Sequence, residues 1–305
     1  MNEGTQGVEL VDQAVERAAA PWLVWSHIPE PLRVPSRSLI AVARRMRARS
    51  SALPDGPLPE LPAAAVELRT KYGSFWFDAR DRKVTPWVRR HATWEADVLR
   101  FAGSVVRPGM VTVDVGANVG FHSVMLAKLV GPLGRVHAYE PLAETLQFLR
   151  ANLWRHGCAN AVVHPAAALD RAGVVSFERD PEGDSGAHVQ LDAATAIQVP
   201  TTTLDEELGG GRVDFLKIDV EGAEPLVLEG ARAVIEASPK LDAVVEFRGG
   251  AHLDGRGPDE VLDLYDSLGL RAHQLLPDGR AVAASRAELL AAAARDETIN
   301  IVLRK

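Results

Sequence analysis

The sequence predicts an α/β fold, in which a mostly parallel sheet is covered by helices on both faces. From about residue 64 onward, short runs rich in β-branched residues alternate with stretches of helical periodicity, and this alternation is typical of βαβ units. The stretch VTVDVGANVGFHSV is a second observation, because a strand-like run ends at Asp114 and a helical pattern begins near Gly120. The glycine-containing segment between them resembles the first strand-to-helix turn of many parallel sheets.

The bulk properties predict a globular protein of the cytoplasm. Of the 305 residues, 47% are hydrophobic and 25% are charged, which is ordinary for a soluble domain. The net charge of −7 argues against nucleic acid as a partner over the whole surface. The single cysteine, Cys158, excludes an intrachain disulfide and fits a reducing compartment. The sequence has no signal-peptide pattern and no apolar run of membrane-spanning length, so we expect no stable membrane insertion.

Residues 1–60 differ from the rest and are predicted to form an N-terminal helical extension. An amphipathic pattern stops near Pro21, and a basic helix, roughly 36–49, lies between two proline-rich stretches, where regular structure is interrupted. The basic helix contains four clustered arginines, Arg44, Arg45, Arg47 and Arg49. Such a face suits an acidic partner, a membrane surface or plain solvent. We expect a main domain at 61–305, and the extension is a candidate surface for homo-oligomer formation.

Turn signals and helix ends define the first half of the main domain. Gly73 marks the turn of a β-hairpin over 66–84, because glycine adopts the backbone conformations of tight turns. Gly131-Pro132 closes one helix and Gly157 closes another, as is common at helix C-termini. In order, the predicted elements are a helix at 92–106, a strand at 110–116, a helix at 121–130, a strand at 135–140, a helix at 142–157 and a strand at 161–169.

The second half continues the alternation after another hairpin. The polar stretch RDPEGDSGAHVQ separates two short strand patterns, so residues 174–191 are predicted to form a hairpin near the mouth of the site. The remaining predicted elements are strands at 213–220, 241–248, 271–276 and 298–304, and helices at 225–238 and 258–270.

The turn DVGANVG is the first candidate ligand-binding element. Gly116 and Gly120 adopt positive φ easily and carry no Cβ, so a ligand can approach the main chain. The first N–H groups of the following helix are free to bind it. The dinucleotide fingerprint G-x-G-x-x-G is not met, because Asn118 and Phe121 replace its second and third glycines. The sequence also contains no P-loop motif, so NAD and nucleotide phosphates are disfavoured.

Two acidic residues at successive strand ends indicate the kind of ligand. Asp114 precedes the glycine turn, where its charge would repel a phosphate and attract a cation. Glu140 ends the next predicted strand in HAYEP, where a carboxylate can accept both hydroxyls of a ribose. A ligand with a ribose, a positive charge and no phosphate is S-adenosylmethionine. The competing interpretation is a tight turn beside a surface glutamate, and we favour the cofactor because both motifs occur together.

Several motifs occur in the order of one known family. VDVGANVGFHSV, AYEP, TTTLDEEL, FLKIDVEGAEPLVLEGA and INIVLRK resemble the FkbM family of S-adenosylmethionine-dependent methyltransferases over residues 66–305, and KIDVEGAE is the most distinctive motif. The resemblance implies a Rossmann-like class I methyltransferase fold with a seven-stranded sheet, and O-methylation in natural-product or glycan biosynthesis. It also implies a set of cofactor-binding residues, with the ribose at Glu140 and the adenine near Ala168: Asp114, Gly116, Asn118, Gly120, Glu140 and Ala168.

Carboxylates after the fourth strand of the predicted βα series are candidate catalytic residues. Asp219 in KIDVEGAE is followed by Glu221, and Glu246 ends the next strand. A hydroxyl acceptor benefits from a general base, so we predict that Asp219 is the base or orients the acceptor, with Glu246 beside it. Alternatively, Asp219, Glu221 and Glu246 hold Mg²⁺, which prefers oxygen ligands. A third interpretation is helix capping, for which Glu224 before Pro225 is best placed.

Histidines and hairpin residues complete the candidate site. His252, in the glycine-rich RGGAHLDGRG, is predicted as a substrate-loop histidine or base, and an exposed loop histidine is the competing interpretation. His122, on the helix after the glycine turn, is a candidate to face the site, and a packed or surface histidine is the simpler explanation. Ser185 and His188 lie in the predicted hairpin turn, where loops often determine specificity, although turn formation alone also explains them.

We therefore predict a methyltransferase that uses S-adenosylmethionine to O-methylate a small molecule, such as a sugar, a glycan or a secondary metabolite. N-methylation is an alternative, since an amine nucleophile needs no strong base. A non-catalytic binding protein that retains the fold is another alternative, against which Asp219 and the intact glycine turn argue. An NAD-binding oxidoreductase is disfavoured by Asn118 and Phe121.

Overall fold

The computed structural model describes residues 59–179, 187–189, 197–296 and 298–305, and the structural statements that follow concern these residues. The predicted basic helix at 36–49, its arginine cluster and Ser185 lie outside them, as does the side chain of His188. Among the helices of the described ranges, none combines the length and the apolarity needed to cross a bilayer.

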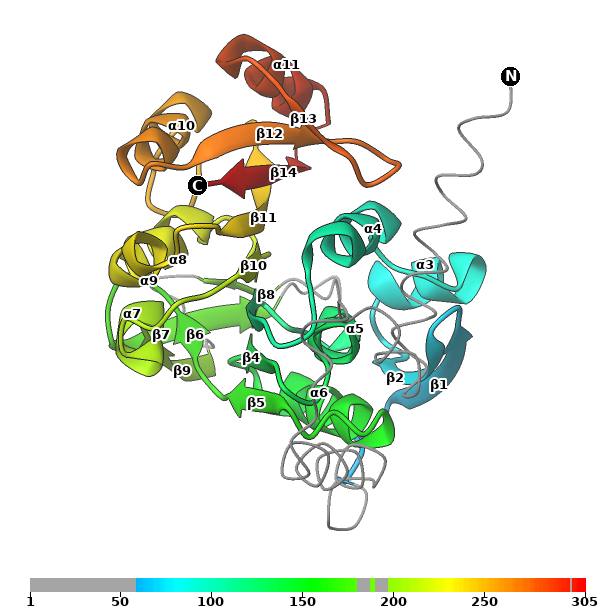
Figure 1. The fold of residues 1–305 in the computed structure, drawn as a ribbon. Helices are drawn as coiled ribbons and strands as arrows, with labels where there is room; N and C mark the ends of the chain where they lie inside the picture. The colour runs from blue at the N-terminus through cyan, green and yellow to red at the C-terminus, as the bar shows by residue number, and fades with distance from the viewer. Residues whose placement is uncertain (1–58, 180–186, 190–196, 297) are drawn as a thin grey trace, which may run out of the picture.

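An eight-stranded sheet forms the centre of the molecule (Figure 1). Its strands lie in the order β13 (Ala281–Ala283), β12 (Arg271–Leu275), β14 (Thr298–Arg304), β11 (Asp242–Arg248), β10 (Phe215–Ile218), β3 (Val111–Val115), β4 (Arg135–Tyr139) and β5 (Ala161–His164). The five strands from β11 to β5 run parallel, which confirms the predicted α/β architecture. The expected number of seven strands is wrong by one, because β13 adds an antiparallel edge strand to β12.

Helices cover both faces of this sheet, as predicted. Figure 1 shows α4 (Ala96–Val105), α5 (Phe121–Val130) and α6 (Ala143–Arg155) on one side, and α8 (Glu224–Glu229), α9 (Arg232–Ala237) and α10 (Pro258–Ser267) on the other. Side chains alternate between the two faces of a strand, so Val113 and Val115 pack against the second group of helices. Val136 and Ala138 pack against the first group. The two apolar cores stabilise the sheet from both sides and fix where its strands end.

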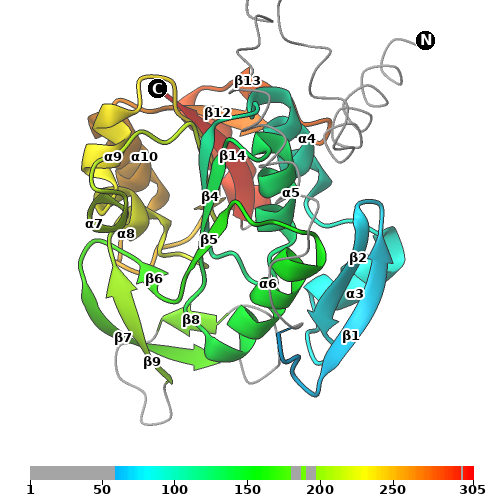
Figure 2. The same ribbon diagram turned by 60° about the horizontal axis from the view of Figure 1, so that its bottom comes forward.

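Two smaller sheets stand beside the central one. The hairpin predicted at 174–191 is confirmed as β7 (Gly173–Arg179) paired with β8 (Ala187–Val189), and β9 (Ile197–Thr202) and β6 (Ala167–Ala168) complete a four-stranded sheet. The predicted N-terminal hairpin is also confirmed, as β1 (Ala65–Thr70) and β2 (Gly73–Asp78). Figure 2 shows this hairpin beside α6, where the Asn152 side chain bonds both the N–H and the carbonyl of Trp76 at 2.8 Å.

Two helices differ from the sequence prediction for local reasons. The helix expected at 225–238 is divided into α8 and α9, because Gly230 between them packs against the backbone of Leu169: a Cβ at Gly230 would lie 1.9 Å from that carbonyl oxygen. The sequence analysis also missed α3 (Val84–His91). The carboxylate of Asp81 accepts the N–H groups of Lys83, Val84 and Thr85 and so begins this helix.

Candidate active site

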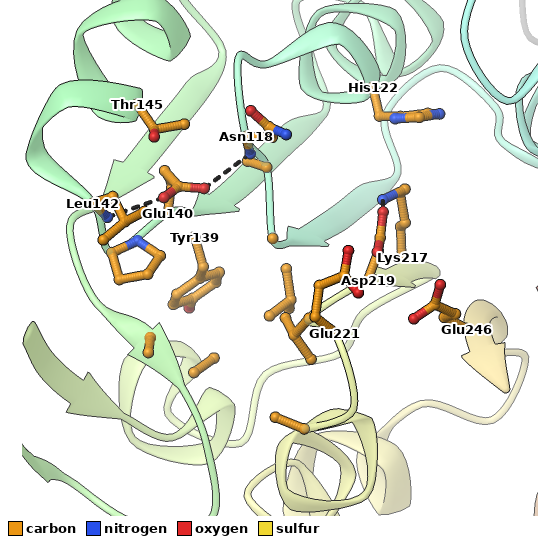
Figure 3. Close-up of a pocket in the computed structure, with 18 of the residues that line it drawn as sticks. Asn118, His122, Tyr139, Glu140, Leu142, Thr145, Lys217, Asp219, Glu221 and Glu246 are labelled. Carbon is orange, nitrogen blue, oxygen red and sulfur yellow. Dashed lines mark hydrogen bonds and ion pairs between the residues drawn. The ribbon is translucent and has the colours of Figure 1, made fainter. Parts of the chain in front are cut away.

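A pocket of about 340 Å³ lies where the central parallel strands end, which is the usual ligand position in such sheets. Its walls come from the turn after β3, the end of β4 with the segment that follows it, β6, the loop after β10, Glu246 within β11 and the start of β14. Figure 3 shows two polar ends, with Glu140 and Asn118 at one and Asp219, Lys217 and Glu246 at the other. The fold therefore brings together residues that are more than a hundred positions apart in the chain.

Glu140 has a fixed orientation at the first end. One of its carboxylate oxygens accepts the N–H of Asn118 at 3.0 Å, and the other accepts the N–H of Leu142 at 2.9 Å. The side chain is buried, and burial outweighs these two hydrogen bonds and raises the pKa of Glu140 to about 7. Each oxygen retains acceptor capacity, so an ionised Glu140 can accept two further hydrogen bonds from a diol. Ala168 lines the same pocket with a side chain of one methyl group.

The glycines of the turn after β3 make room for the protein itself. A Cβ at Gly116 would lie 1.9 Å from the carbonyl oxygen of Asp219, and one at Gly120 would lie 2.6 Å from the Leu149 side chain. Both glycines have positive φ, 79° and 85°. Gly116 also lines the pocket, whereas Gly120 is not among its lining residues. The turn therefore needs glycine for its packing against β10 and α6, in addition to any contact with a ligand.

Asp114 supports the site from behind its wall. Its side chain is fully buried, accepts a hydrogen bond from the Ser123 hydroxyl at 2.5 Å, and does not line the pocket. Burial raises the pKa of Asp114, against the opposing effects of Lys217 and Ser123. The register of β3 and β10 pairs Asp114 with Lys217, so the two side chains project from the same face. The structure thus places Asp114 next to a protein cation, Lys217, one layer away from the ligand space.

A buried lysine organises the second end of the pocket. The Lys217 ammonium lies 2.9 Å from Asp219 and 3.9 Å from Glu95. Burial alone would lower the pKa of Lys217, but Asp219, Glu95 and Asp114 outweigh it and raise that pKa. Burial likewise opposes ionisation of Asp219, and the attraction of Lys217 overcomes it and lowers the pKa of Asp219. Asp219 therefore stays ionised at neutral pH, which suits a hydrogen-bond acceptor better than a proton-accepting base.

Glu246 has the opposite protonation behaviour. Burial, followed by the negative charges of Asp219, Glu221 and Glu224, raises the pKa of Glu246 to about 8, and Arg248 offsets only part of this. Glu246 and Glu221 share the Arg248 guanidinium, at 3.3 and 2.6 Å. Asp219 pairs with Lys217 instead, and Lys83 lies 3.7 Å from Glu221, so the three acids are divided among three cations. In the described part of the chain no group of three or more histidine, cysteine or acidic side chains is arranged to hold a metal ion.

Both histidines are buried, but only His122 lines the pocket. His252 is buried, with Nδ1 3.4 Å from Glu224, and does not line the pocket. The expectations of a mobile substrate-loop histidine and of an exposed loop histidine are both wrong, because the 252–256 turn packs this side chain inward. His122 is also buried but does line the pocket, with Nε2 3.4 Å from Glu95. Burial lowers the pKa of His122 well below its ordinary value, so its ring is neutral.

Strained backbone gathers around the same pocket. Four non-glycine residues in the described ranges have positive φ, and three of them line the pocket: Glu95 (φ 40°), Asn118 (φ 49°) and Glu221 (φ 55°). Such conformations cost energy and persist where the surrounding structure enforces them, most often at functional sites. This clustering supports the location of the site independently of its charges.

The sequence analysis missed Lys217 and Glu95 as members of the site. Lys217 stands in the middle of an apolar strand, FLKI, and is buried, which is rare for a lysine without a charged partner. A lysine at such a position indicates a buried charged partner, and this pattern could have identified Lys217 from the sequence. Glu95 precedes α4, and its carboxylate accepts a hydrogen bond from Asn300 of β14 at 3.0 Å. No local sequence pattern predicts this contact, because 205 positions separate the two residues.

Comparison with known proteins adds independent information. The family profile described as methyltransferase FkbM domain matches residues 114–271, slightly more than half of the chain. Fibrillarin from Aeropyrum pernix, solved with natively bound S-adenosyl-L-methionine, is 12% identical with a TM-score of 0.41, covering 83% of this chain and 86% of that one. The matched range contains most of the residues that line the pocket, including those of the turn after β3, the end of β4, the loop after β10 and Glu246 of β11.

Two curated relatives match half of this chain or less. The 31-O-demethyl-FK506 methyltransferase FkbM of Streptomyces tacrolimicus is 33% identical over 162 residues, covering 42% of this chain and 62% of that protein. The AMB antimetabolite synthetase AmbE of Pseudomonas aeruginosa is 30% identical over 201 residues, covering 50% of this chain and 9% of that protein. The chain therefore matches less than two thirds of the length of either relative.

Proposed function

The chain belongs to the FkbM methyltransferase family, and we propose that it transfers the methyl group of S-adenosylmethionine to a hydroxyl group of a small molecule, such as a sugar, a glycan or a secondary metabolite. One observation carries the proposal: the same pocket has a buried carboxylate with spare acceptor capacity, Glu140, at one end and a cluster of acids at the other. The name of the Streptomyces relative specifies 31-O-demethyl-FK506 as its acceptor, which supports a hydroxyl as the methylated group.

The residues at the first end fit the proposed cofactor. Glu140 is held by two backbone N–H groups with acceptor capacity to spare, so it can bind the ribose hydroxyls. Asn118, with its left-handed backbone, lines the same end, and the small side chain of Ala168 leaves space for a flat ring. When bound, S-adenosylmethionine supplies an electrophilic methyl group attached to a positively charged sulfur. Asp114 would act indirectly from behind the wall, through its hydrogen bond with Ser123 and its charge near Lys217.

The residues at the second end would prepare the acceptor. Asp219 is kept ionised by Lys217, so it accepts a hydrogen bond from the acceptor hydroxyl and orients it. Glu246, whose pKa lies near 8, is matched to removing a proton close to neutral pH. We therefore assign orientation to Asp219 and the role of general base to Glu246. His252 takes no part in proton transfer in this scheme, since it does not line the pocket.

The proposal extends to the setting of the reaction. We place the protein in the cytoplasm, and the 1–60 extension next to the 61–305 methyltransferase domain is the part available for self-association. A metal ion is not needed in this scheme, because Arg248 and Lys217 already pair with the acids that would bind it.

The decisive experiment is a product analysis. The protein is incubated with S-adenosylmethionine and a panel of sugars, polyols and phenols, and methylated products and S-adenosylhomocysteine are measured by mass spectrometry. A methyl ether is expected, with the same yield in EDTA. An N-methyl product from a parallel amine panel would favour the alternative acceptor, and activity lost in EDTA and restored by Mg²⁺ would favour the metal-dependent one. Tight binding of NAD, with no binding of the methyl donor, would reject the proposal.

A further inference from the structure

Glu224 is the first residue of α8, and its side chain turns back onto the loop before the helix. It has no solvent exposure. One carboxylate oxygen accepts the N–H of Val220 at 3.1 Å and the N–H of Gly222 at 3.0 Å. Glu224 therefore fastens the loop 219–223 to the start of α8.

This loop does not hold its shape by local preference. Glu221 has φ 55° and Gly222 has φ 102°, and a left-handed conformation is unfavourable for a glutamate. The carbonyl of Gly222 is held separately by the N–H of Leu253 at 2.9 Å. The loop supplies Asp219, Val220 and Glu221 to the pocket wall. A small change in its path would therefore move pocket carboxylates directly.

The other side of the loop is packed against the glycine turn. A Cβ added to Gly116 would lie only 1.9 Å from the Asp219 carbonyl oxygen, so the loop and the turn are in close contact here. Glu224 holds the loop through hydrogen bonds to two of its amides, and Gly116 packs against the backbone of the same loop at Asp219. The spacing between the turn after β3 and the acids after β10 is thus determined by two contacts that do not involve a ligand.

Further polar side-chain atoms lie buried near Glu224, on His252 and Tyr265. The second Glu224 oxygen lies 3.4 Å from His252 Nδ1. In the described part of the chain this oxygen, both His252 ring nitrogens and the Tyr265 hydroxyl are buried without a hydrogen-bond partner. Buried unpartnered polar groups destabilise a fold.

We propose that Glu224 is a positioning residue, which sets the place of Asp219 and Glu221 in the acceptor end of the pocket by holding the amides of Val220 and Gly222. The proposal rests on the proposed function for its kinetic consequence. Its structural part, the holding of two amides, does not depend on which acceptor is used. Misplacement of a reacting group by about 1 Å can lower a rate roughly 10²-fold, so the kinetic effect is expected in turnover.

Two variants separate hydrogen bonding from space filling. Glu224→Gln keeps an oxygen that accepts both N–H groups, whereas Glu224→Leu fills similar space without an acceptor. We expect Glu224→Leu to lower kcat at least about tenfold, with the Kd for S-adenosylmethionine changed less than threefold, and Glu224→Gln to retain most of kcat. Glu229→Gln is the matched control at the other end of α8, where the glutamate pairs with Arg256 outside the loop.

Amide hydrogen exchange tests the holding of the two amides without a methyl-acceptor substrate. The Val220 and Gly222 amides should exchange faster in Glu224→Leu and remain protected in Glu224→Gln and Glu229→Gln. A folded Glu224→Leu variant with unchanged kcat and unchanged exchange would overturn the proposal, and so would equal damage in both Glu224 variants. If Glu224→Leu does not fold, Glu224→Asp takes its place in the test. The shorter aspartate side chain should lose the hydrogen bonds to Val220 and Gly222, and kcat should fall as expected for Glu224→Leu. An unchanged kcat in Glu224→Asp would also overturn the proposal. If no acceptor is methylated, faster exchange still supports the positioning role while the proposed function fails.

Discussion

At the scale of single residues, the pocket uses burial to give its carboxylates different protonation states. Glu140 and Glu246 have raised pKa values, of about 7 and about 8, whereas the pKa of Asp219 is lowered by its contact with Lys217. The same side-chain chemistry therefore supplies an acceptor that is always ionised and a base that titrates near neutral pH. These differences lead to two predictions, one for each end of the pocket.

Binding of S-adenosylmethionine should weaken as the pH falls below about 7, because protonation of Glu140 removes acceptor capacity for the ribose. We expect roughly tenfold weaker binding for each pH unit well below that pKa. Isothermal titration calorimetry measures it, and adenosine, which has the ribose without the amino acid part, should show the same trend. Glu140→Gln should bind weakly at every pH; a variant that binds as tightly as the original protein contradicts the ribose assignment.

Turnover should rise with pH up to about 8, because Glu246 must lose its proton to act as a base. Glu246→Gln should lower kcat about 10²-fold or more and abolish this rise. Asp219→Asn should also lower kcat and keep the rise with pH, but the rise should move to lower pH, because the charge of Asp219 contributes to the raised pKa of Glu246. The comparison uses initial rates from pH 6 to 9 with saturating methyl donor. A pH profile that disappears in Asp219→Asn and survives in Glu246→Gln reverses the two roles.

At the scale of elements, the turn between β3 and α5 connects both halves of the site. The glycine pattern in the sequence correctly predicts a strand-to-helix turn at this place. Gly116 has a second reason besides the expected approach of a ligand, because its missing side chain leaves space for the backbone of the Asp219 loop. The break of the predicted 225–238 helix at Gly230 has the same kind of cause. A close approach between distant segments cannot be inferred from local spacing, so such glycines look like turn or helix signals in the sequence.

Gly116→Ala should destabilise the protein by more than about 2 kcal/mol and weaken cofactor binding, since the new methyl group has no space and positive φ is unfavourable. Gly109→Ala is the matched control: Gly109 also has positive φ, at 88°, but nothing lies within 4 Å of its added Cβ. It should cost only about 1 kcal/mol and leave binding unchanged. Urea unfolding and calorimetric titration test both; equal effects at the two positions would show that close packing at Gly116 is unimportant.

At the scale of the whole molecule, the buried acids should make the free protein less stable as the pH rises from about 6.5 to 8. The native pKa values of Glu95 and Glu140 are near 7 and that of Glu246 is near 8, all above the ordinary 4.5. The folded state then binds more protons than the unfolded state, so stability falls as the pH rises through these values. The buried His122 and the half-buried His137 have lowered pKa values and act in the opposite direction, but only below about pH 6.5.

Thermal unfolding of the ligand-free protein tests this expectation. We expect Tm to fall by a few degrees between pH 6.5 and 8.5, and Glu246→Gln to reduce the slope, most clearly above pH 7. S-adenosylmethionine should raise Tm throughout, because it binds the folded state. A Tm that is flat or rising in this interval would show that these carboxyls are less perturbed than their burial implies.

The sequence by itself determined the alternation of strands and helices, the hairpins, the strand-to-helix turn at Gly116 and the acids that end β4 and β11, because periodicity, turn residues and strand ends are local properties. Only the tertiary structure decided which of these residues meet. It placed Asp114 behind the pocket wall, buried His252 beside Glu224, paired Lys217 with Asp219, and brought Glu95 to Asn300. The physical reason is that burial and charge pairing, which set protonation and orientation, depend on neighbours contributed by distant parts of the chain.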